Sequence, residues 1–351
     1  MSTSLFETAK RFFILVVLIF CSFIIATYLF SMGLGVLVLF STPEGLVFSR
    51  ESIPLNPLLI SDVAVNVNAG LYFLFLWWIF ALCFVAAWRN REGLLGNVQV
   101  FFSGSSRINP FKNNLLAMPA IASILFVTTI VLHTLQSQAG FPTGEPIVGD
   151  PFLDFLMVSR APIIEEIIFR IIPIGTLLVT YISVVGGSTR YGLTIGARLK
   201  MAILSVVQPD KAKEMMGLKT IDRNGFFGGG VTWGEWIMVL LTSSAFGIAH
   251  FFSGWGPGKI SQASINGAVF ALAYLYYGIQ APLLLHWYFN YYFTAFDLST
   301  VYYSMEIDIA YSLSVLANFF FGVLLWIGLI SLCVIIALRK LRQIPKPPIP
   351  G

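Results

Sequence analysis

Two adjacent glutamates, Glu165 and Glu166, lie with Arg170 inside an apolar segment of the sequence. Two of the three histidines, His250 and His286, lie inside two later apolar segments. Ionisable side chains are costly within a lipid bilayer, so a group of them in apolar segments indicates a functional site. Because carboxylates and imidazoles exchange protons near neutral pH, the group indicates acid–base chemistry within a membrane.

The spacing within each segment predicts which side chains share one face of a helix. Residues four apart are neighbours on a helix surface, and three pairs have this spacing. Glu165 points about 100° away from Glu166, so it is free to face a different neighbour. Gly247 permits close approach of the helix that follows. The three pairs are Glu166 and Arg170, suited to an ion pair, Phe246 and His250, and His286 and Asn290.

These residue types suit the activation of water. A carboxylate beside neutral imidazoles can take a proton from water and pass it to a leaving amine. Imidazole and carboxamide donors can stabilise the oxyanion that forms on a scissile carbonyl. Glutamate and histidine are also zinc ligands, so Glu165, His250 and His286 could hold Zn²⁺ or another divalent metal. The sequence has no His-Glu-x-x-His helix, which leaves the metal an open alternative.

The composition indicates that the elements which position these residues lie in a membrane. The 351 residues are 57% hydrophobic and 11% charged, against about 25% charged in soluble domains. We predict an all-α, polytopic integral membrane bundle of about eight transmembrane helices, forming a single membrane domain over residues 1–351. Charge-free stretches place the spans within residues 11–44, 62–89, 112–145, 170–190, 235–259, 259–278, 280–297 and 308–339.

The helix that carries Glu165 must extend beyond its charge-free stretch. Glu165 and His286 reach similar depths only if that helix begins near Pro151, with kinks at Pro162 and Pro173. We therefore predict a longer fourth helix and a site in a cavity open to the cytosol. His133, alone near the end of the third span, is interpreted as a packing residue.

Most of the 21 basic residues fall in the same set of loops as the two termini, which predicts that both termini are cytosolic. This distribution accounts for the net charge of +4 without a nucleic-acid partner. Residues 187–231 are predicted to form a cytosolic loop, and residues 343–351 a flexible tail. The three cysteines are interpreted as buried apolar residues without a disulfide, and they are Cys21, Cys83 and Cys333.

Glu165-Glu166-x-x-x-Arg170, Phe246-x-x-x-His250 and His286-x-x-x-Asn290, in this order, resemble three motifs of a known family. It is the CAAX-protease and bacteriocin-processing family, also called the Abi family, of intramembrane endopeptidases. It includes the Ras-converting CAAX endopeptidases. The resemblance covers about residues 150–300, which would form the catalytic core. It implies an eight-helix fold that cleaves peptide bonds within or near the membrane.

The resemblance also implies roles for the motif residues. Glu165 would activate the water, and His250, His286 and Asn290 would complete the site and hold the oxyanion or a metal. Glu166 and Arg170 would support them, with Phe246 beside them. Family members are commonly described as metalloproteases. The implied partners are membrane lipids and protein or peptide substrates, which in the eukaryotic branch are prenylated and are trimmed after the modified cysteine.

Two other classes of protein remain compatible with the sequence. Intramembrane glutamates and histidines form proton relays in transporters, although no internal repeat supports a transporter here. A non-enzymatic membrane immunity or scaffold protein could retain the same helices. The change Glu165→Gln separates these classes, because only the endopeptidase needs this carboxylate to cleave a peptide.

Overall fold

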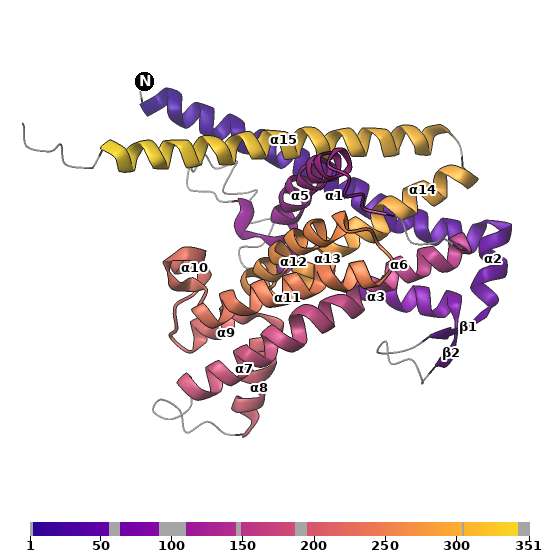
Figure 1. The fold of residues 1–351 in the computed structure, drawn as a ribbon, viewed down its shortest axis with the longest axis horizontal. Coiled ribbons are helices and arrows are strands. Elements are labelled where there is room, and N and C mark those ends of the chain that lie inside the picture. The colour runs from indigo at the N-terminus through magenta and orange to yellow at the C-terminus, as the bar shows by residue number, and fades with distance from the viewer. Residues whose placement is uncertain are drawn as a thin grey trace, which may run out of the picture.

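The computed structural model describes residues 3–55, 64–90, 110–144, 149–186, 195–303 and 305–342. These residues form a helix bundle with one short hairpin (Figure 1). The elements in chain order are α1 (Thr3–Ser41), α2 (Pro43–Arg50), β1 (Ser52–Leu55), β2 (Val65–Asn68), α3 (Ala69–Arg89), η1 (Pro110–Lys112), α5 (Asn114–Gln138), α6 (Pro151–Glu166), η2 (Ile167–Ile171), α7 (Ile172–Gly186), α8 (Ile195–Val207), α9 (Pro209–Met215), α10 (Ile221–Asn224), η3 (Phe226–Gly230), α11 (Trp233–Phe252), α12 (Gly258–Tyr277), α13 (Gln280–Trp287), η4 (Tyr288–Tyr292), α14 (Phe293–Tyr302) and α15 (Met305–Arg342).

The predicted all-α membrane bundle is confirmed, whereas the count of eight spans is not. Within the described residues, six helical segments are long and apolar enough to cross a membrane. The other two expected spans, α12 and the continuous run α13–η4–α14, are helical but carry more polar residues. The six segments are Lys10–Ser41, Ala69–Arg89, Asn114–Gln138, Pro151–Val184, Trp233–Phe252 and Met305–Leu338.

The fourth helix begins where the depth argument predicts. Asp150 caps α6, and its side chain accepts hydrogen bonds from the backbone N–H groups of Phe152 and Leu153, both at 2.9 Å. Such a cap satisfies N–H groups that have no partner within the helix. The helical run then continues through η2, a π-helical turn, into α7. This length brings Glu165, near the end of α6, to the middle of the bundle.

The predicted break between the sixth and seventh spans is also confirmed. Gly278 ends α12 with φ +100°, a conformation that residues with a side chain rarely adopt. The backbone N–H of Ile279 then donates to the carbonyl of Val207 at 3.0 Å, which fixes the turn against the end of α8. The chain re-enters the bundle as α13, which carries His286.

An aromatic core holds the run α13–η4–α14 in place. Trp287, Tyr288, Tyr291 and Tyr292 are all buried, and the rings of Trp287 and Tyr291 stack with centroids 3.9 Å apart. Tyr28 of α1 packs against three of these rings. Aromatic side chains bury large apolar areas with defined geometry, so this core fixes the helix on which His286 lies.

The start of α1 and the end of α15 lie at one end of the molecule (Figure 1). In Figure 1 the start of α1 and the end of α15 lie on the same side as α8, α9 and α10, and α2 with the hairpin β1–β2 lies at the opposite end. This arrangement agrees with the predicted grouping of the loops. The structure contains no membrane, so the cytosolic location of the termini stays a prediction.

Three details differ from the sequence-based expectations or extend them. The hairpin β1–β2, with Ser52 opposite Asn68, is an addition to an otherwise helical fold. Residues 195–231 contain α8, α9, α10 and η3, so this part of the expected loop 187–231 is mostly helical. Cys333 is exposed, because the last part of α15 projects beyond the bundle, whereas Cys21 and Cys83 are buried as predicted. Residues 187–194 and the expected flexible tail 343–351 lie outside the described residues.

Candidate active site

The two glutamates lie at the end of α6, and the adjoining π-helical turn η2 carries Arg170. Arg170 Nη1 donates to Glu166 Oε1 at 3.0 Å, and both side chains are fully buried. The predicted ion pair is therefore present. A π-helical turn inserts an extra residue into the helix and is frequent at functional sites. Its presence here was not signalled by the four-residue spacing.

His286 approaches both carboxylates from α13. Its Nδ1 lies 2.8 Å from Glu166 Oε1 and its Nε2 lies 3.5 Å from Glu165 Oε2. The ring is almost fully buried. Because a carboxylate oxygen only accepts hydrogen bonds, Nδ1 donates to Glu166, and this bond directs Nε2 toward Glu165. The acceptor on Glu166 is the same oxygen that binds Arg170.

His250 approaches Glu165 from the end of α11. Its Nδ1 lies 2.9 Å from the carbonyl oxygen of Phe246, and its Nε2 lies 4.0 Å from Glu165 Oε2. A carbonyl oxygen only accepts, so Nδ1 carries the proton, and Nε2 of the neutral ring presents a lone pair. The bond to the main chain fixes this tautomer and aims the lone pair at Glu165.

Three hydrogen-bond acceptors therefore face one another across a small space. Glu165 Oε2 is buried and has no hydrogen-bond partner among the described residues, and it faces Nε2 of His250 and of His286. Buried acceptors without donors are costly, so the space favours a molecule with O–H groups. A quarter of the Glu165 side chain is exposed, which allows water to reach it. A water molecule bound there could donate its two O–H groups to two of these three acceptors.

An aromatic wall closes the site on the side of the arginine. The guanidinium group of Arg170 lies 4.1 Å from the centroid of the Phe246 ring, a cation–π contact. The same ring meets His250 and His286 edge-on, with centroids 4.5 and 5.6 Å away. Gly267 of α12 makes room for these groups, because an added Cβ would lie 2.6 Å from Arg170 Nη2.

His250 lies near the end of α11, yet its ring reaches the same depth in the bundle as Glu165 and His286. Side chains of a helix point toward its N-terminus, so the ring of His250 reaches back one turn and packs on Phe246. Gly247 lets α11 approach α12 closely, since a Cβ there would collide with Ile260 and Ser264. The predicted close approach of these helices is thus confirmed.

Two sequence-based candidates lie apart from this group. Asn290 lies in the π-helical turn η4, one turn beyond His286, and is partly buried. Within the described structure, no hydrogen bond joins its side chain to Glu165 or to either catalytic-site imidazole, and its carbonyl accepts from Thr294 Oγ1 at 2.7 Å. His133 is exposed and pairs through Nδ1 with Thr143 Oγ1 at 2.5 Å, away from the glutamates.

Sequence reasoning missed two residues of the site. Gly267 has no motif around it, and its role depends on a contact between α12 and η2 that spacing along the chain cannot indicate. Lys259 is the second residue of α12 and interacts electrostatically with Glu165. Its signal was a single basic residue between two apolar stretches, on the side of the membrane where few basic residues were expected.

The arrangement does not fit a bound metal as it stands. In the described part of the chain, no group of three or more histidine, cysteine, aspartate or glutamate side chains could hold a metal ion. Glu166 Oε1 accepts hydrogen bonds from Arg170 and from His286 Nδ1, so this oxygen is not free as a ligand. Zn²⁺ or another divalent ion at Glu165, His250 and His286 stays a prediction.

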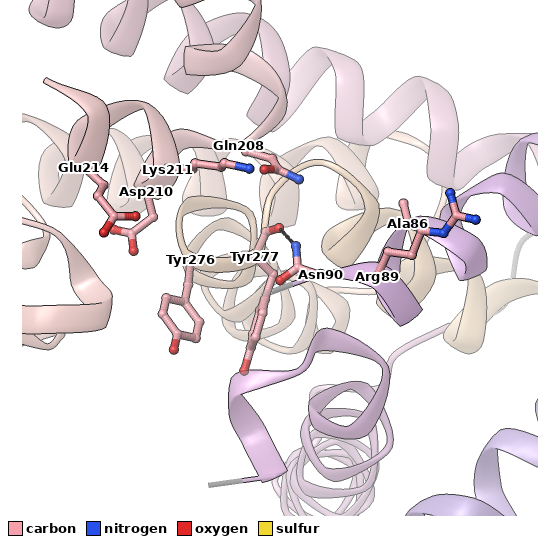
Figure 2. Close-up of a pocket in the computed structure, with 9 residues that line it drawn as sticks. All are labelled: Ala86, Arg89, Asn90, Gln208, Asp210, Lys211, Glu214, Tyr276 and Tyr277. Carbon is pink, nitrogen blue, oxygen red and sulfur yellow. Dashed lines mark hydrogen bonds between the residues drawn. The ribbon is translucent and has the colours of Figure 1, made fainter. Parts of the chain in front are cut away.

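A separate polar cavity of about 380 Å³ lies where α3, α9 and α12 meet (Figure 2). Within it, Asn90 Nδ2 donates to the carbonyl of Tyr277 at 2.7 Å and joins the end of α3 to the end of α12. None of the motif residues lines this cavity, so it is distinct from the glutamate–histidine group. Its lining residues are Ala86, Arg89, Asn90, Gln208, Asp210, Lys211, Glu214, Tyr276 and Tyr277.

A comparison of the sequence with models of known families gives one match. Residues 149–292 match the model of the family described as type II CAAX prenyl endopeptidase Rce1-like, and the match includes every motif residue. This segment is therefore similar to the Rce1-like family. The resemblance seen in the three motifs is thereby confirmed, since the matching family model describes prenyl endopeptidases. No curated protein and no solved structure matched the chain.

Proposed function

We propose that the protein is an intramembrane endopeptidase in which Glu165 activates water against peptide bonds of membrane-associated or lipidated, CAAX-type substrates. One observation carries the proposal: the buried, unpartnered Glu165 Oε2 faces the Nε2 atoms of two imidazoles, at 3.5 and 4.0 Å. A general base must lie within reach of the proton it takes, directly or through one water. A water bound among these three atoms meets that condition.

In the proposed reaction, Glu165 Oε2 accepts one proton of the bound water while an imidazole Nε2 accepts a hydrogen bond from the other O–H. The water oxygen then attacks the carbonyl carbon of the scissile bond and forms a tetrahedral intermediate. Glu165 passes the proton to the amide nitrogen, and the C–N bond breaks. The products are a carboxylic acid and an amine, and Glu165 returns to its starting form.

The oxyanion of the intermediate needs donors. If His286 Nε2 takes up a proton from solvent, it becomes a donor, and the Glu166 carboxylate 2.8 Å from Nδ1 balances the charge, while His250 Nε2 accepts from the water. The carboxamide of Asn290, one turn further along the same helical run, is the second donor that we propose. It would turn toward the substrate on binding, because hydrogen bonds of catalytic groups often form only in the complex.

Glu166 and Arg170 hold the machinery in place. The buried carboxylate accepts from both Arg170 Nη1 and His286 Nδ1, so it fixes the orientation of the imidazole. Arg170 in turn packs on Phe246, whose backbone carbonyl orients His250. The two histidines are therefore positioned by one connected set of contacts, which is the preorganisation that proton transfer needs.

The proposed partners follow from the family and from the surroundings of the site. The family description names CAAX prenyl endopeptidases, so we propose substrates with a lipid-modified cysteine near the C-terminus. Apolar helices surround the site, and they would admit a substrate whose lipid lies in the bilayer. Membrane lipids are therefore further partners. A cavity open to the cytosol, with both termini on that side, remains part of the proposal.

The test is cleavage of peptides by purified protein in liposomes. We expect hydrolysis of a farnesylated CAAX peptide at one bond, identified by mass spectrometry, and slower hydrolysis of the unlipidated peptide. His250→Ala and His286→Ala should each lower the rate by about 10²-fold or more. A parallel reaction with chelator tests the metal. If the wild-type protein cleaves neither peptide and instead moves protons across the liposome membrane in a Glu165-dependent way, the transporter alternative replaces this proposal.

A further inference from the structure

Two cations without carboxylate partners line the polar cavity where α3, α9 and α12 meet. Arg89 ends α3 and Lys211 lies in α9, and both side chains are exposed. Among the described residues, no carboxylate lies within 4.0 Å of either cation. Figure 2 shows the two cations on opposite sides of Asn90. The polar cavity therefore offers two positive charges to an incoming anion.

The two acids that line the same cavity already have donors. Asp210 accepts hydrogen bonds from the backbone N–H groups of Ile221 and Asp222, at 2.6 and 3.2 Å. Glu214 accepts from Arg223 Nη2 at 2.7 Å. Because these donors offset the acidic charges, the two unpaired cations decide which ligand the cavity favours, and that ligand is an anion.

The wall of the polar cavity at Asn90 is held firmly and contains an acceptor without a donor. Asn90 Nδ2 donates to the carbonyl of Tyr277 at 2.7 Å, and Asn113 Nδ2 donates to the carbonyl of Asn90 at 3.1 Å. Asn90 is buried, and its Oδ1 has no hydrogen-bond partner among the described residues. A buried acceptor without a donor is costly, so a ligand with an O–H or N–H group is favoured.

The polar cavity lies at the level where a bilayer has its phosphate groups. Arg89 is the last residue of one helix that could span a membrane, and Asn114 is the first residue of the next. Basic side chains at the ends of spanning helices lie among the lipid headgroups. Basic pockets between such helices bind anionic headgroups, so a phosphate ester of a lipid is the anion that these cations would meet.

A second cavity, of about 480 Å³, adjoins the polar one and is more apolar. The last two residues of α12, both tyrosines, line both cavities. Ile121 of α5 and Val269 of α12 supply apolar surface, and the stretch from Val269 to the end of α12 is about 12 Å long. The two charged residues of its lining, Lys112 and Asp222, pair with each other at 3.6 Å. A polar and an apolar cavity side by side fit the headgroup and an acyl chain of one lipid, whereas a soluble phosphate ester would fill only the first.

We propose that the two adjoining cavities bind one anionic phospholipid, with its phosphate at Arg89 and Lys211 and an acyl chain between α5 and α12. The phosphate oxygens accept charge-assisted hydrogen bonds from the guanidinium and ammonium groups. A hydroxyl or ammonium group of the headgroup supplies the donor that Asn90 Oδ1 lacks. This inference goes beyond the proposed function and does not depend on it, because no motif residue lines either cavity.

The test measures lipid binding to the purified full chain in detergent by native mass spectrometry. Phosphatidylglycerol and phosphatidylcholine with the same acyl chains are compared, and we expect one phosphatidylglycerol to bind with a Kd about tenfold lower, the size of one charge-assisted hydrogen bond. Arg89→Gln and Lys211→Met should each reduce this preference, and the double variant should lose it. Lys200→Met, at an exposed position of α8 outside both cavities, should keep it.

The apolar cavity is tested separately. Val269→Trp fills the space for the acyl chain and should weaken phosphatidylglycerol binding about tenfold, whereas Val269→Leu should bind nearly as the wild type does. Glycerol 1-phosphate, a soluble phosphate ester without acyl chains, should not displace the lipid at concentrations at which short-chain phosphatidylglycerol does. Thermal melting of each variant checks that it is folded.

Three outcomes overturn the inference. The first is an equal Kd for the two lipids in the wild-type protein, and the second is an undiminished preference in the double variant of Arg89 and Lys211. The third is displacement of the lipid by glycerol 1-phosphate together with unchanged binding in Val269→Trp, because the polar cavity would then be a site for a soluble phosphate ester. None of these measurements involves peptide cleavage, so the endopeptidase proposal stands or fails separately.

Discussion

The adjacent glutamates should separate catalysis from stability when each is changed to glutamine. Glu165→Gln preserves the size of the side chain and removes a charge that no arginine or lysine contacts. Because Glu165 Oε2 is buried without a partner among the described residues, we expect the loss of its charge to leave the free energy of unfolding unchanged or to raise it. Loss of the general base should lower the cleavage rate by about 10²–10⁴-fold, or about 3–5 kcal/mol in the activation free energy.

Glu166→Gln should mainly lower the stability of the protein. Glu166 Oε1 accepts from Arg170 Nη1 at 3.0 Å and from His286 Nδ1 at 2.8 Å, and the Arg170 side chain is fully buried. Removing one member of a buried ion pair costs about 3–5 kcal/mol, because the other charge stays buried without a partner. Glutamine keeps one acceptor oxygen, so we expect about 3 kcal/mol and a melting temperature several degrees lower.

The assay measures both properties on the same preparations. Cleavage rates are taken at saturating peptide and per folded molecule, and melting is followed in the same detergent. Glu51→Gln, at an exposed position after α2, serves as the matched control and should change neither property. The reasoning is refuted if Glu165→Gln cleaves at the wild-type rate. It is also refuted if Glu165→Gln melts as low as Glu166→Gln, because Glu165 would then be structural.

Two further substitutions test the packing that supports the site. Gly267→Ala places a Cβ 2.6 Å from Arg170 Nη2, so we expect a loss of about 1–3 kcal/mol in stability together with lower activity. Gly33→Ala on α1, where no atom lies within 4 Å of an added Cβ, should instead be neutral or slightly stabilising, and equal melting of the two variants would contradict the clash. Lys213→Met breaks a fully buried pair with Glu235 at 2.7 Å and should cost about 3–5 kcal/mol while sparing the rate per folded molecule. The exposed Arg223 pair, changed in the same way, should cost less than about 1 kcal/mol, and thermal melting distinguishes the two.

Much of the fold follows from the sequence because bilayer chemistry limits the choices. Long charge-free stretches can only be helices in lipid, where every backbone polar group needs an internal partner. The start of the fourth helix near Pro151 followed from the need to bring Glu165 and His286 to one depth, and the break at Gly278 followed from a charge-free stretch too long for one span. The count of eight spans did not follow, because α12 and α13–η4–α14 carry polar residues that bury inside the bundle and lower their apolar character.

The site itself was only partly predictable. Four-residue spacing gave the Glu166–Arg170 pair, since neighbours on one helix are set by local geometry alone. The exposure of Cys333 and the helices within residues 195–231 were missed, because burial and folding of these parts depend on contacts with other elements. The role of Gly267 was missed for the same reason.

By itself, the sequence determined which residue types lie in the membrane and which of them share a helix face, because composition and periodicity are local properties of the chain. Tertiary structure alone decided that His286 binds Glu166 through one nitrogen and faces Glu165 with the other. It also decided that Phe246, Arg170 and Gly267 pack together. These relations join α6, α11, α12 and α13, and side chains on separate helices meet only where packing of the whole bundle brings them together.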